Sequence, residues 1–307
     1  MTEGRRTNER PSASLVAAVL NQFGARIDPD EPGWTGEESV GWRAETADGA
    51  SFVQRLPRWR SLEELAWCDR VARAAGSRAP EAVCARTADG DAIAIETDEG
   101  LVCVFPFIEG AHPTTGTEIA GKASELLARL HQGLVGTWMT GVPRPPGLMA
   151  RAPIEGDVPA ILIDPELDAW EREMTTGSAP QNVIHGDFYP GNLIVRGGMI
   201  VGVIDWLEAR VEHQAQEVSW AAWEFCQNES GDDLVNEAAR AFLTTYVEAG
   251  GPAEIGPGID PIPWIRQRLR REAAPALREA GSRPLESEYH IGQIRAFHAL
   301  RGRHLWR

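Results

Sequence analysis

The sequence predicts an α+β fold in two lobes, a small strand-rich N-terminal lobe followed by a larger and mostly helical C-terminal lobe. Alternating apolar residues and Asp-Gly turns dominate the first hundred residues, whereas helical periodicity dominates later and is interrupted by one pair of strands. The pattern changes at LVCVFPFIEG, an apolar run that ends in Pro and Gly. We therefore expect an N-terminal lobe at residues 1–108 and a C-terminal lobe at 109–307.

Two hairpins and one helix are predicted in the N-terminal lobe. VGWRAET and SFVQRLP flank the turn ADGA, and AVCAR and DAIAIET flank the turn TADGD, so each pair has the pattern of a hairpin. SLEELAWCDRVARAAG lies between them, opens with a Ser that can cap a helix, and ends at a Gly. Its apolar residues recur at spacings of three and four, which predicts a helix over 61–76.

The C-terminal lobe begins with a predicted helix over residues 117–134, TEIAGKASELLARLHQGL. NLIVRGGMIVGVIDW then supplies two β-rich runs around a Gly-Gly pair, which predicts a hairpin over 192–206. WIRQRLRREAAPALREAG, at 264–281, carries an Arg-rich helical face. We expect that face to be solvated, because a charge run is usually exposed.

Charge and composition limit the classes of partner. The chain has 30 Lys and Arg against 45 Asp and Glu, a formal charge of −15, which opposes binding to nucleic acid and leaves small molecules as the expected partners. No run is long enough to span a membrane, and the N-terminal apolar stretch is too interrupted for a signal peptide. The expected location is the cytoplasm, without a membrane or nucleic-acid partner.

The spacing of the cysteines and the presence of a single lysine limit the kinds of site that the chain can form. The four cysteines, at 68, 84, 103 and 226, lack the spacing of a zinc site or a disulfide framework, so we expect buried thiols. Lys122 is the only lysine of the chain. Any task usually given to lysine must therefore fall to Lys122 or to an arginine.

The stretch VIHGDFYPGN, at 183–192, carries more turn-forming and polar residues than one loop requires. The hairpin that follows folds back at its Gly-Gly turn, so Asn192 before the first strand and Asp205 after the second reach the same open end. Asp187 lies five residues before Asn192. Such carboxylate and amide oxygens are the ligands that Mg²⁺ accepts.

HGDFYPGN followed by VIDW resembles the catalytic loop and metal-binding segment of the aminoglycoside phosphotransferase and choline kinase-like family, which has the bilobal fold of protein kinases. The family pattern is HGD, then Asn five residues after the Asp, then a hairpin that leads to Ile-Asp, and every part is present at fitting spacing. HGD alone is a weak signal, whereas the combination is specific. The resemblance covers about residue 30 to beyond 225.

The resemblance implies a role for each matching position. Asp187 is similar to the catalytic base that orients an acceptor hydroxyl and receives its proton. Asn192 and Asp205 are similar to the residues that hold Mg²⁺ across the nucleotide phosphates. His185 is similar to a residue that supports the loop by hydrogen bonding, and we expect that structural role rather than a catalytic one.

The family also has a basic residue on the third strand of the N-terminal lobe, which touches the nucleotide phosphates. FVQR resembles that segment, which makes Arg55 the candidate, with Arg58 and Arg60 as competitors. Lys122 lies in a predicted helix beyond the connector and cannot fill a strand position. An arginine binds phosphate as a forked, permanently charged donor.

An acid on the following helix pairs with that basic residue in the family. Glu64 is the candidate, with Glu63 as its rival, while some relatives carry the acid where this chain has Cys68. The family connector binds adenine through backbone groups, and alignment on the Gly of FIEG makes Pro106 the carbonyl acceptor and Ile108 the N–H donor.

The acceptor is less well defined than the donor. In the family, helices beyond the metal-binding Asp wall the acceptor site; here Glu217, Trp220 and Glu224 share one helical face, with Trp223 beside them. Acidic and aromatic side chains there suit a cationic amine or a sugar face, although core packing explains the tryptophans better.

The resemblance implies an ATP- and Mg²⁺-dependent kinase that phosphorylates a hydroxyl of a small molecule, with GTP as a possible alternative donor. An aminoglycoside-type or other antibiotic is the leading acceptor, as for a resistance kinase. A metabolic kinase acting on choline, homoserine or a sugar is nearly as well supported. A nucleotide-binding regulator without turnover is a further alternative, and the oligomeric state is left open.

Overall fold

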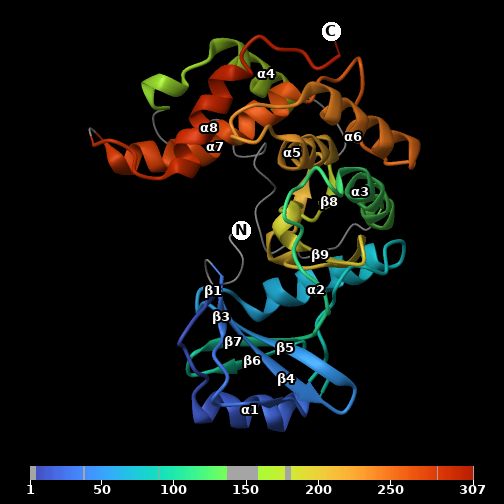
Figure 1. The fold of residues 1–307 in the computed structure, drawn as a ribbon, viewed down its shortest axis with the longest axis vertical. Helices are drawn as coiled ribbons and strands as arrows, with labels where there is room; N and C mark the ends of the chain where they lie inside the picture. Colours follow the sequence, from blue (N-terminus) through green and yellow to red (C-terminus); the bar gives the residue numbers. More distant parts are fainter. Residues whose placement is uncertain are drawn as a thin grey trace. The chain divides into compact units, whose positions relative to one another are not determined.

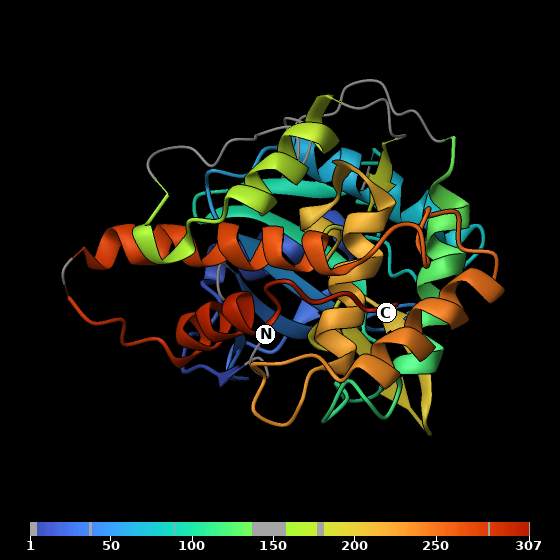
Figure 2. The same cartoon turned by 90° about the horizontal axis from the view of Figure 1, so that it is seen from above.

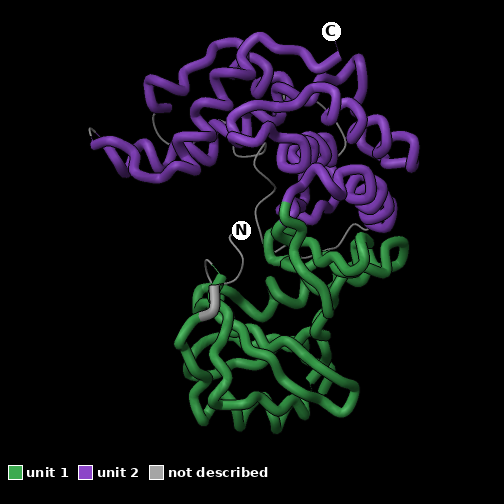
Figure 3. The backbone as a smooth tube through the Cα atoms, in the orientation of Figure 1, with its two compact units in different colours: residues 1–114, 139–144, 191–209 green, residues 115–138, 145–190, 210–307 purple. Residues whose placement is uncertain are grey.

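The computed structural model describes residues 5–36, 39–88, 90–136, 158–176, 181–281 and 283–306. These residues form two compact units (Figure 3). Unit 1 contains the described residues up to 114 and also 191–209, while unit 2 contains the rest. The N-terminal lobe was expected to end at residue 108, whereas unit 1 extends to 114 and takes in the hairpin of 192–206 as well.

Unit 1 is built on an antiparallel sheet (Figure 1). Among the described residues it has seven strands in the order β1-β3-β4-β5-β7-β6, with β2 paired to β4. Its strands are β1 Arg5–Arg6, β2 Arg26–Ile27, β3 Trp34–Thr35, β4 Val40–Thr46, β5 Gly49–Leu56, β6 Ala94–Thr97 and β7 Gly100–Pro106. The central hairpin β4–β5 confirms the prediction from the alternating residues and the Asp-Gly turn.

The second predicted hairpin is wrong. AVCAR forms no strand, and DAIAIET supplies β6, which pairs with β7 through a tight turn. Ala82 makes an isolated parallel bridge to Val203 instead. The short apolar segment AVCAR is therefore used to join the sheet to a distant hairpin, a pairing that local alternation does not reveal.

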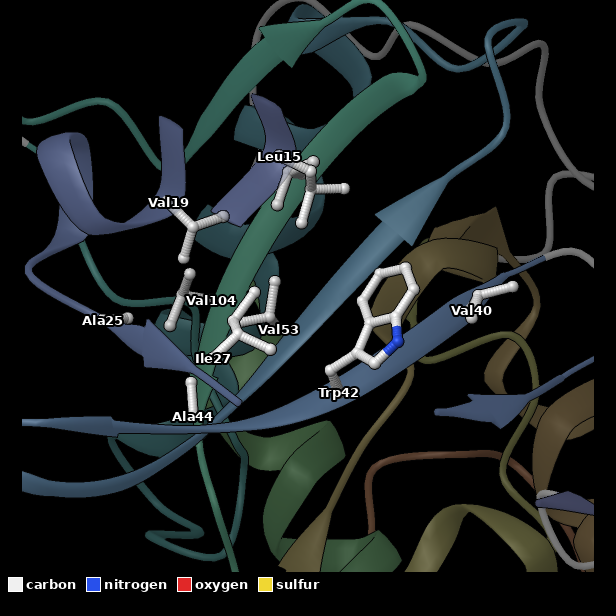
Figure 4. Close-up of a cluster of buried hydrophobic side chains, with 10 residues drawn as sticks. Leu15, Val19, Ala25, Ile27, Val40, Trp42, Ala44, Val53 and Val104 are labelled. Atoms are coloured by element: carbon white, nitrogen blue, oxygen red, sulfur yellow. The ribbon is translucent and has the colours of Figure 1, made fainter. Parts of the chain in front are cut away.

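One face of the sheet is covered by helix α1, Ala13–Phe23 (Figure 4). Ser12 caps the helix by accepting the N–H of Leu15, and Gly24 ends it with a left-handed backbone, φ 62°. Leu15 and Val19 pack on strand residues that include Trp42 and Val53. This face of the sheet is the main hydrophobic core of unit 1.

Helix α2, Leu62–Gly76, packs against the other face of the sheet. Ser61 caps it by accepting the N–H of Glu64, as the sequence predicts. Leu65 joins a cluster with Leu56 and Cys103 of the sheet, and Leu207 packs against that cluster. Leu207 belongs to the 3₁₀ turn η4, Trp206–Glu208, so this cluster connects α2 to the end of the second hairpin.

That second hairpin consists of β9, Leu193–Arg196, and β10, Met199–Val203. Gly197 and Gly198 have φ of 58° and 74°, the left-handed values that a tight two-residue hairpin turn requires. Ala111 bridges to Val195 with both backbone hydrogen bonds, at 2.9 and 2.8 Å. The segment after β7 is thus paired to the hairpin by backbone contacts.

Unit 2 is mainly helical (Figures 1 and 2). Helix α7 packs against α8, α5 and α4, and α3 packs against α6 and α5. The short strands β8 and β11 pair beside them. The elements are α3 Ala120–Leu134, α4 Pro165–Thr176, β8 Asn182–Ile184, β11 Arg210–Glu212, α5 Gln214–Cys226, α6 Asn236–Glu248, α7 Ile262–Ala280 and α8 Glu288–Ala299.

The Arg-rich helix α7 is not solvated in the way its sequence suggests. Arg266 and Arg270 are buried, and their guanidinium groups bind carboxylates of Asp164 and of Asp168 and Glu171 respectively. These acids lie about a hundred residues earlier in the chain. Buried arginines need such partners, and the partners come from the segment around α4, which helical periodicity in α7 cannot show.

No helix within the described part of the chain is both long and apolar enough to cross a membrane.

Candidate functional site

Unit 1 contains a cavity of about 540 Å³ between the α2 face of the sheet and the segment after β7. Aromatic side chains line much of it: Trp34, Phe52, Phe105 and Phe107. Cys68 and Cys103 also line it, and burial raises the pKa of both thiols to about 12. A flat apolar ring system fits such a lining, since aromatic side chains pack against it offset-stacked or edge to face.

Glycine is required at one position on the cavity wall. A Cβ atom on Gly41 would lie 2.1 Å from the ring of Phe52, which is the partner strand's side chain. The ring of Phe52 therefore lies directly over the backbone of β4. This close approach gives one wall of the cavity its flat shape.

Pro106 and Ile108, the predicted adenine-binding positions, both line the cavity. Pro106 is the last residue of β7 and pairs with Ser51. Gly110, two residues after Ile108, packs closely against Ile194, since a Cβ atom at Gly110 would lie 2.5 Å from a methyl group of Ile194. The two residues assigned to adenine thus border the cavity, and the binding role of their backbone groups stays a prediction.

The second hairpin brings Asn192 and Asp205 to the same end, as the sequence predicts. Leu193 is paired with Val203, and the N–H of Ile204 donates to the carbonyl of Asn192 at 3.0 Å. Asn192 is fully buried, and Asp205 lines the cavity. The backbone pairing thus places Asn192 and Asp205 at one end of the hairpin, with Asp205 on the cavity wall.

Asp205 has a left-handed backbone, φ 61° and ψ 66°. Such a conformation costs a non-glycine residue on the order of 1 kcal/mol and is maintained only where the surroundings enforce it. Asp205 is followed at once by η4, whose Trp206 and Leu207 are held by the core of unit 1. This left-handed conformation of Asp205 sets the direction in which the chain leaves the hairpin.

The Asn192 and Asp205 side chains suit a hard divalent cation by their chemistry, because both offer oxygen donors. Among the described residues no group of three or more His, Cys, Asp and Glu side chains could enclose a metal ion. A pair of protein oxygens is typical of Mg²⁺ sites that share the ion with phosphate groups and water. The donor set therefore fits a nucleotide-associated metal better than a structural one.

The buried carboxylate of Glu217, on α5, binds the backbone of the HGD loop in unit 2. It accepts the N–H groups of His185, at 3.1 Å, and Gly186. The other contact of that carboxylate is with the ring of His131, at 2.7 Å, whose second nitrogen lies 2.7 Å from the Tyr246 hydroxyl. Burial alone would raise the pKa of Glu217, but these contacts hold it below its ordinary value.

Glu217 is thus committed to the loop rather than to an acceptor, which differs from the sequence expectation for this helix. The N–H of Asp187 donates to the ring of His185 at 3.3 Å, a supporting contact of the kind expected for that histidine. Gly186 adopts φ 89°, which only glycine accepts readily. The loop conformation around Asp187 is therefore fixed on both sides.

Arg268 of α7 contacts this loop directly. Its guanidinium lies 3.4 Å from a carboxylate oxygen of Asp187 and 3.4 Å from the carbonyl of Gly186. The ring of Trp220 lies 4.4 Å from the guanidinium carbon, and Glu272 accepts from Nε at 2.7 Å. Although burial lowers its pKa, the neighbouring acids raise it overall, so Arg268 is a fixed cation beside Asp187.

Two further acids lie near the same cation. Burial raises the pKa of Glu224 to about 7, opposed by Arg268 and reinforced by Glu272 and Asp187. Glu272 also accepts the hydroxyl of Tyr289 at 2.9 Å. The part of unit 2 around Asp187 therefore combines one permanent cation with an acid that takes up a proton near neutral pH.

The structure contradicts the expected ion pair between Arg55 and Glu64. Arg55 is bound to Glu99 at 2.8 Å and to Glu9 at 2.6 Å. In the sheet register Arg55 lies opposite Val40 and Val102, which belong to the core beneath α1. Arg55 therefore lies on the sheet face opposite the cavity.

The neighbouring residue Gln54 lies opposite Gly41 and Cys103, and all three line the cavity. Side chains alternate between the two faces of a strand, so the segment FVQR directs its Gln and not its Arg to this cavity. Glu64 pairs instead with Arg60, at 2.6 Å. Arg60 was the competitor that the sequence left open.

Sequence reasoning missed Arg268 and Glu272 as site residues. Both lie in the stretch that the sequence predicts to be a solvated Arg-rich face. Their spacing of four residues on a helix was the available signal of an ion pair, but nothing in the sequence places that pair beside Asp187.

Comparison with known proteins supports the same class. Residues 32–257 match the model of the phosphotransferase enzyme family. A homoserine kinase of Zymomonas mobilis is 26% identical over 163 residues, which cover 47% of this chain and 48% of that protein. The match thus spans about half the length of that relative.

Solved structures share the fold. An amicoumacin kinase in complex with AMP-PNP and Ca²⁺ superposes with a TM-score of 0.69 at 12% identity, covering 94% of this chain and 92% of that one. A spectinomycin phosphotransferase in complex with ADP and spectinomycin gives 0.61 at 12% identity, covering 94% of each chain. The predicted α+β, protein-kinase-like fold is confirmed by this likeness, and the family match covers well over half of the sequence. The chain belongs to the phosphotransferase enzyme family, as its HGD, Asn and Ile-Asp motifs predict.

Proposed function

We propose that the protein is an ATP-dependent O-phosphotransferase that transfers the γ-phosphate to a hydroxyl of a small molecule. The observation that carries the proposal is the aromatic cavity of unit 1, which borders both the Pro106–Ile108 segment and Asp205. A nucleotide needs a flat apolar slot for its base and oxygen ligands for the metal on its phosphates, and unit 1 offers both.

In the proposed reaction Asp187 accepts the proton of the acceptor hydroxyl as that oxygen forms a bond to the γ-phosphorus. The bond from the γ-phosphorus to the bridging oxygen breaks, and ADP leaves with that oxygen. Asn192 and Asp205 are the residues that would hold Mg²⁺, which neutralises phosphate charge when it is bound. Arg268 and Glu217 keep the Asp187 loop in one conformation.

The acceptor that the unit 2 residues suit best is an alcohol that also carries an amine. The negative charges of Glu272 and Asp187 act on Glu224 and raise its pKa. A bound ammonium group would stabilise the charged form of Glu224. Aminoglycoside-type and other antibiotics with amino groups belong to this class. The antibiotic kinases among the fold relatives favour this assignment.

A metabolic kinase for a hydroxy amino acid such as homoserine is the second candidate. The 26% identity to a homoserine kinase over half the chain favours it. Arg268 beside Asp187 offers a fixed cation for the carboxylate of such an acceptor. The two candidates differ in acceptor size and in the charge that the acceptor presents.

The test is a mass-spectrometric screen for a gain of one phosphate on aminoglycosides, other antibiotics, choline, homoserine and sugars, run with ATP or GTP and Mg²⁺. Asp187→Ala should abolish the gain while nucleotide binding is retained, and a variant that phosphorylates normally would refute the base assignment. ATP hydrolysis without any phosphorylated acceptor would favour a nucleotide-binding regulator instead.

A further inference from the structure

The cation partner of Glu64 does not come from the sheet in this chain. Arg60 lies in the connection between β5 and α2, and its side chain is only 3% exposed. It donates to Glu64 at 2.6 Å, and the ring of Trp59 lies 4.2 Å from its guanidinium carbon. No lysine or arginine is among the described residues that line the cavity.

Arg60 also reaches the segment that follows Asp205. Its guanidinium donates to the carbonyl of Leu207 at 3.3 Å and to the carboxylate of Glu208 at 3.1 Å. Both residues belong to η4, which begins directly after Asp205. One planar group thus joins the first turn of α2 to the turn that sets the direction of Asp205.

The electrostatic surroundings of Cys68 agree with this arrangement. Burial is the main cause of the high pKa of Cys68; the charges of Glu64, Glu208 and Asp205 raise this pKa further, and the charge of Arg60 lowers it. These groups therefore surround one point of the cavity wall. Since Asp205 is held in a left-handed backbone, its position depends on what fixes the residues that follow it.

Charge balance favours the same role. Two acids, Glu64 and Glu208, converge on Arg60, and Glu64 is largely buried. Removing the guanidinium would leave these carboxylates facing each other near Asp205. We infer that Arg60 is a positioning residue that holds Asp205 for its cation, while the strand position facing the nucleotide is the neutral Gln54. This inference rests on the proposed nucleotide site.

Replacing a residue that orients a metal ligand typically lowers metal affinity by about ten- to a hundredfold. Arg60→Gln should lower the Mg²⁺-dependent gain in ADP affinity by about tenfold or more. Arg60→Lys keeps the charge but lacks the fork that reaches two acids, so we expect an intermediate loss. Arg55→Gln should leave the gain unchanged.

The experiment measures ADP binding by titration calorimetry with and without Mg²⁺, at a temperature where circular dichroism shows each variant folded. Glu208→Gln is included because Glu208 is 47% exposed, so its replacement removes the ion pair with η4, but not the bond to the Leu207 carbonyl, without burying an unpaired charge. A reduced Mg²⁺-dependent gain in this variant is expected, although smaller than in Arg60→Gln.

An unchanged gain in both Arg60→Gln and Glu208→Gln would overturn the inference, as would an equal loss in Arg55→Gln. These results would leave the proposed function intact, provided that the wild-type protein binds ADP. A wild-type protein that binds no nucleotide would refute the proposed function itself and this inference with it.

Discussion

The guanidinium of Arg268 lies 3.4 Å from a carboxylate oxygen of Asp187, and both residues belong to unit 2. The same guanidinium approaches the carbonyl of Gly186, so it contacts both the side chain and the backbone of the HGD loop. An arginine can do this because its donors form a planar fork. Helix α7 thereby participates in orienting the loop.

Arg268→Gln should reduce kcat by about a hundredfold, because small displacements of a reacting group have effects of that size. ADP affinity should stay unchanged, since Arg268 does not line the cavity of unit 1. Steady-state kinetics with the acceptor found in the screen measures the effect. Arg278→Gln is the matched control on the exposed side of the same helix. Equal turnover in the two variants would contradict the role.

Replacement of Asp205 should remove the metal dependence of nucleotide binding. Asn adopts a left-handed backbone readily, so Asp205→Asn removes the charge without changing the strain. We expect ADP affinity to become insensitive to Mg²⁺ and to added chelator, as measured by calorimetry. Asp91→Asn is the control, because Asp91 has a similar φ of 63° and is exposed. A Mg²⁺ response as large as that of the wild type would show that Asp205 is not a ligand.

Glu224 should make stability depend on pH between about 4.5 and 7. Its pKa is raised from 4.5 to about 7, so over this range the folded state binds more protons than the unfolded state. Stability is therefore lost as the pH rises through this window, by about 2 kcal/mol once partial exposure is allowed for. The groups that act on Glu224 include Arg268, Glu272 and Asp187.

Urea unfolding from pH 5 to pH 8 checks this dependence. Glu224→Gln should flatten the curve relative to wild type, whereas Glu248→Gln, an exposed position on α6, should not. A wild-type protein that gains stability over the same range relative to Glu224→Gln would show that the sign is wrong.

Glu217→Gln should destabilise the protein by about 3 kcal/mol. The buried carboxylate accepts hydrogen bonds through both oxygens, whereas the amide that replaces it has one acceptor oxygen and one donor NH₂ group. The N–H groups of His185 and Gly186 and the ring of His131 all depend on that carboxylate. Urea unfolding measures the loss against Glu237→Gln, an exposed replacement on α6. A loss below that of the control would contradict the supporting role.

The sequence predicted features that depend on local rules. The hairpin of β4 and β5, the N-cap of α2 and the fold-back of the second hairpin follow from turn residues and periodicity. The hydrogen bond between Asn192 and Ile204, just after β10, follows from the Gly197-Gly198 turn. Such signals lie within a few residues of the structure that they specify.

Features that depend on distant partners were predicted wrongly. FVQR predicts that its Arg is directed to the phosphates, but the register with β4 and β7 turns Gln54 to the cavity and Arg55 away from it. The face that a strand residue occupies is decided by which side the helices cover, and alternation alone leaves both sides possible. The buried Arg266 likewise depends on Asp164, 102 residues away.

The cavity of unit 1 has a practical consequence for chemical proteomics. Nucleotide probes that label kinases by acylating a lysine near the phosphates need an amine side chain at that place. The described lining here contains none, and the single lysine, Lys122, lies on α3 in unit 2. Acyl-phosphate nucleotide probes should therefore leave this cavity unlabelled, even if the proposed nucleotide binding is correct.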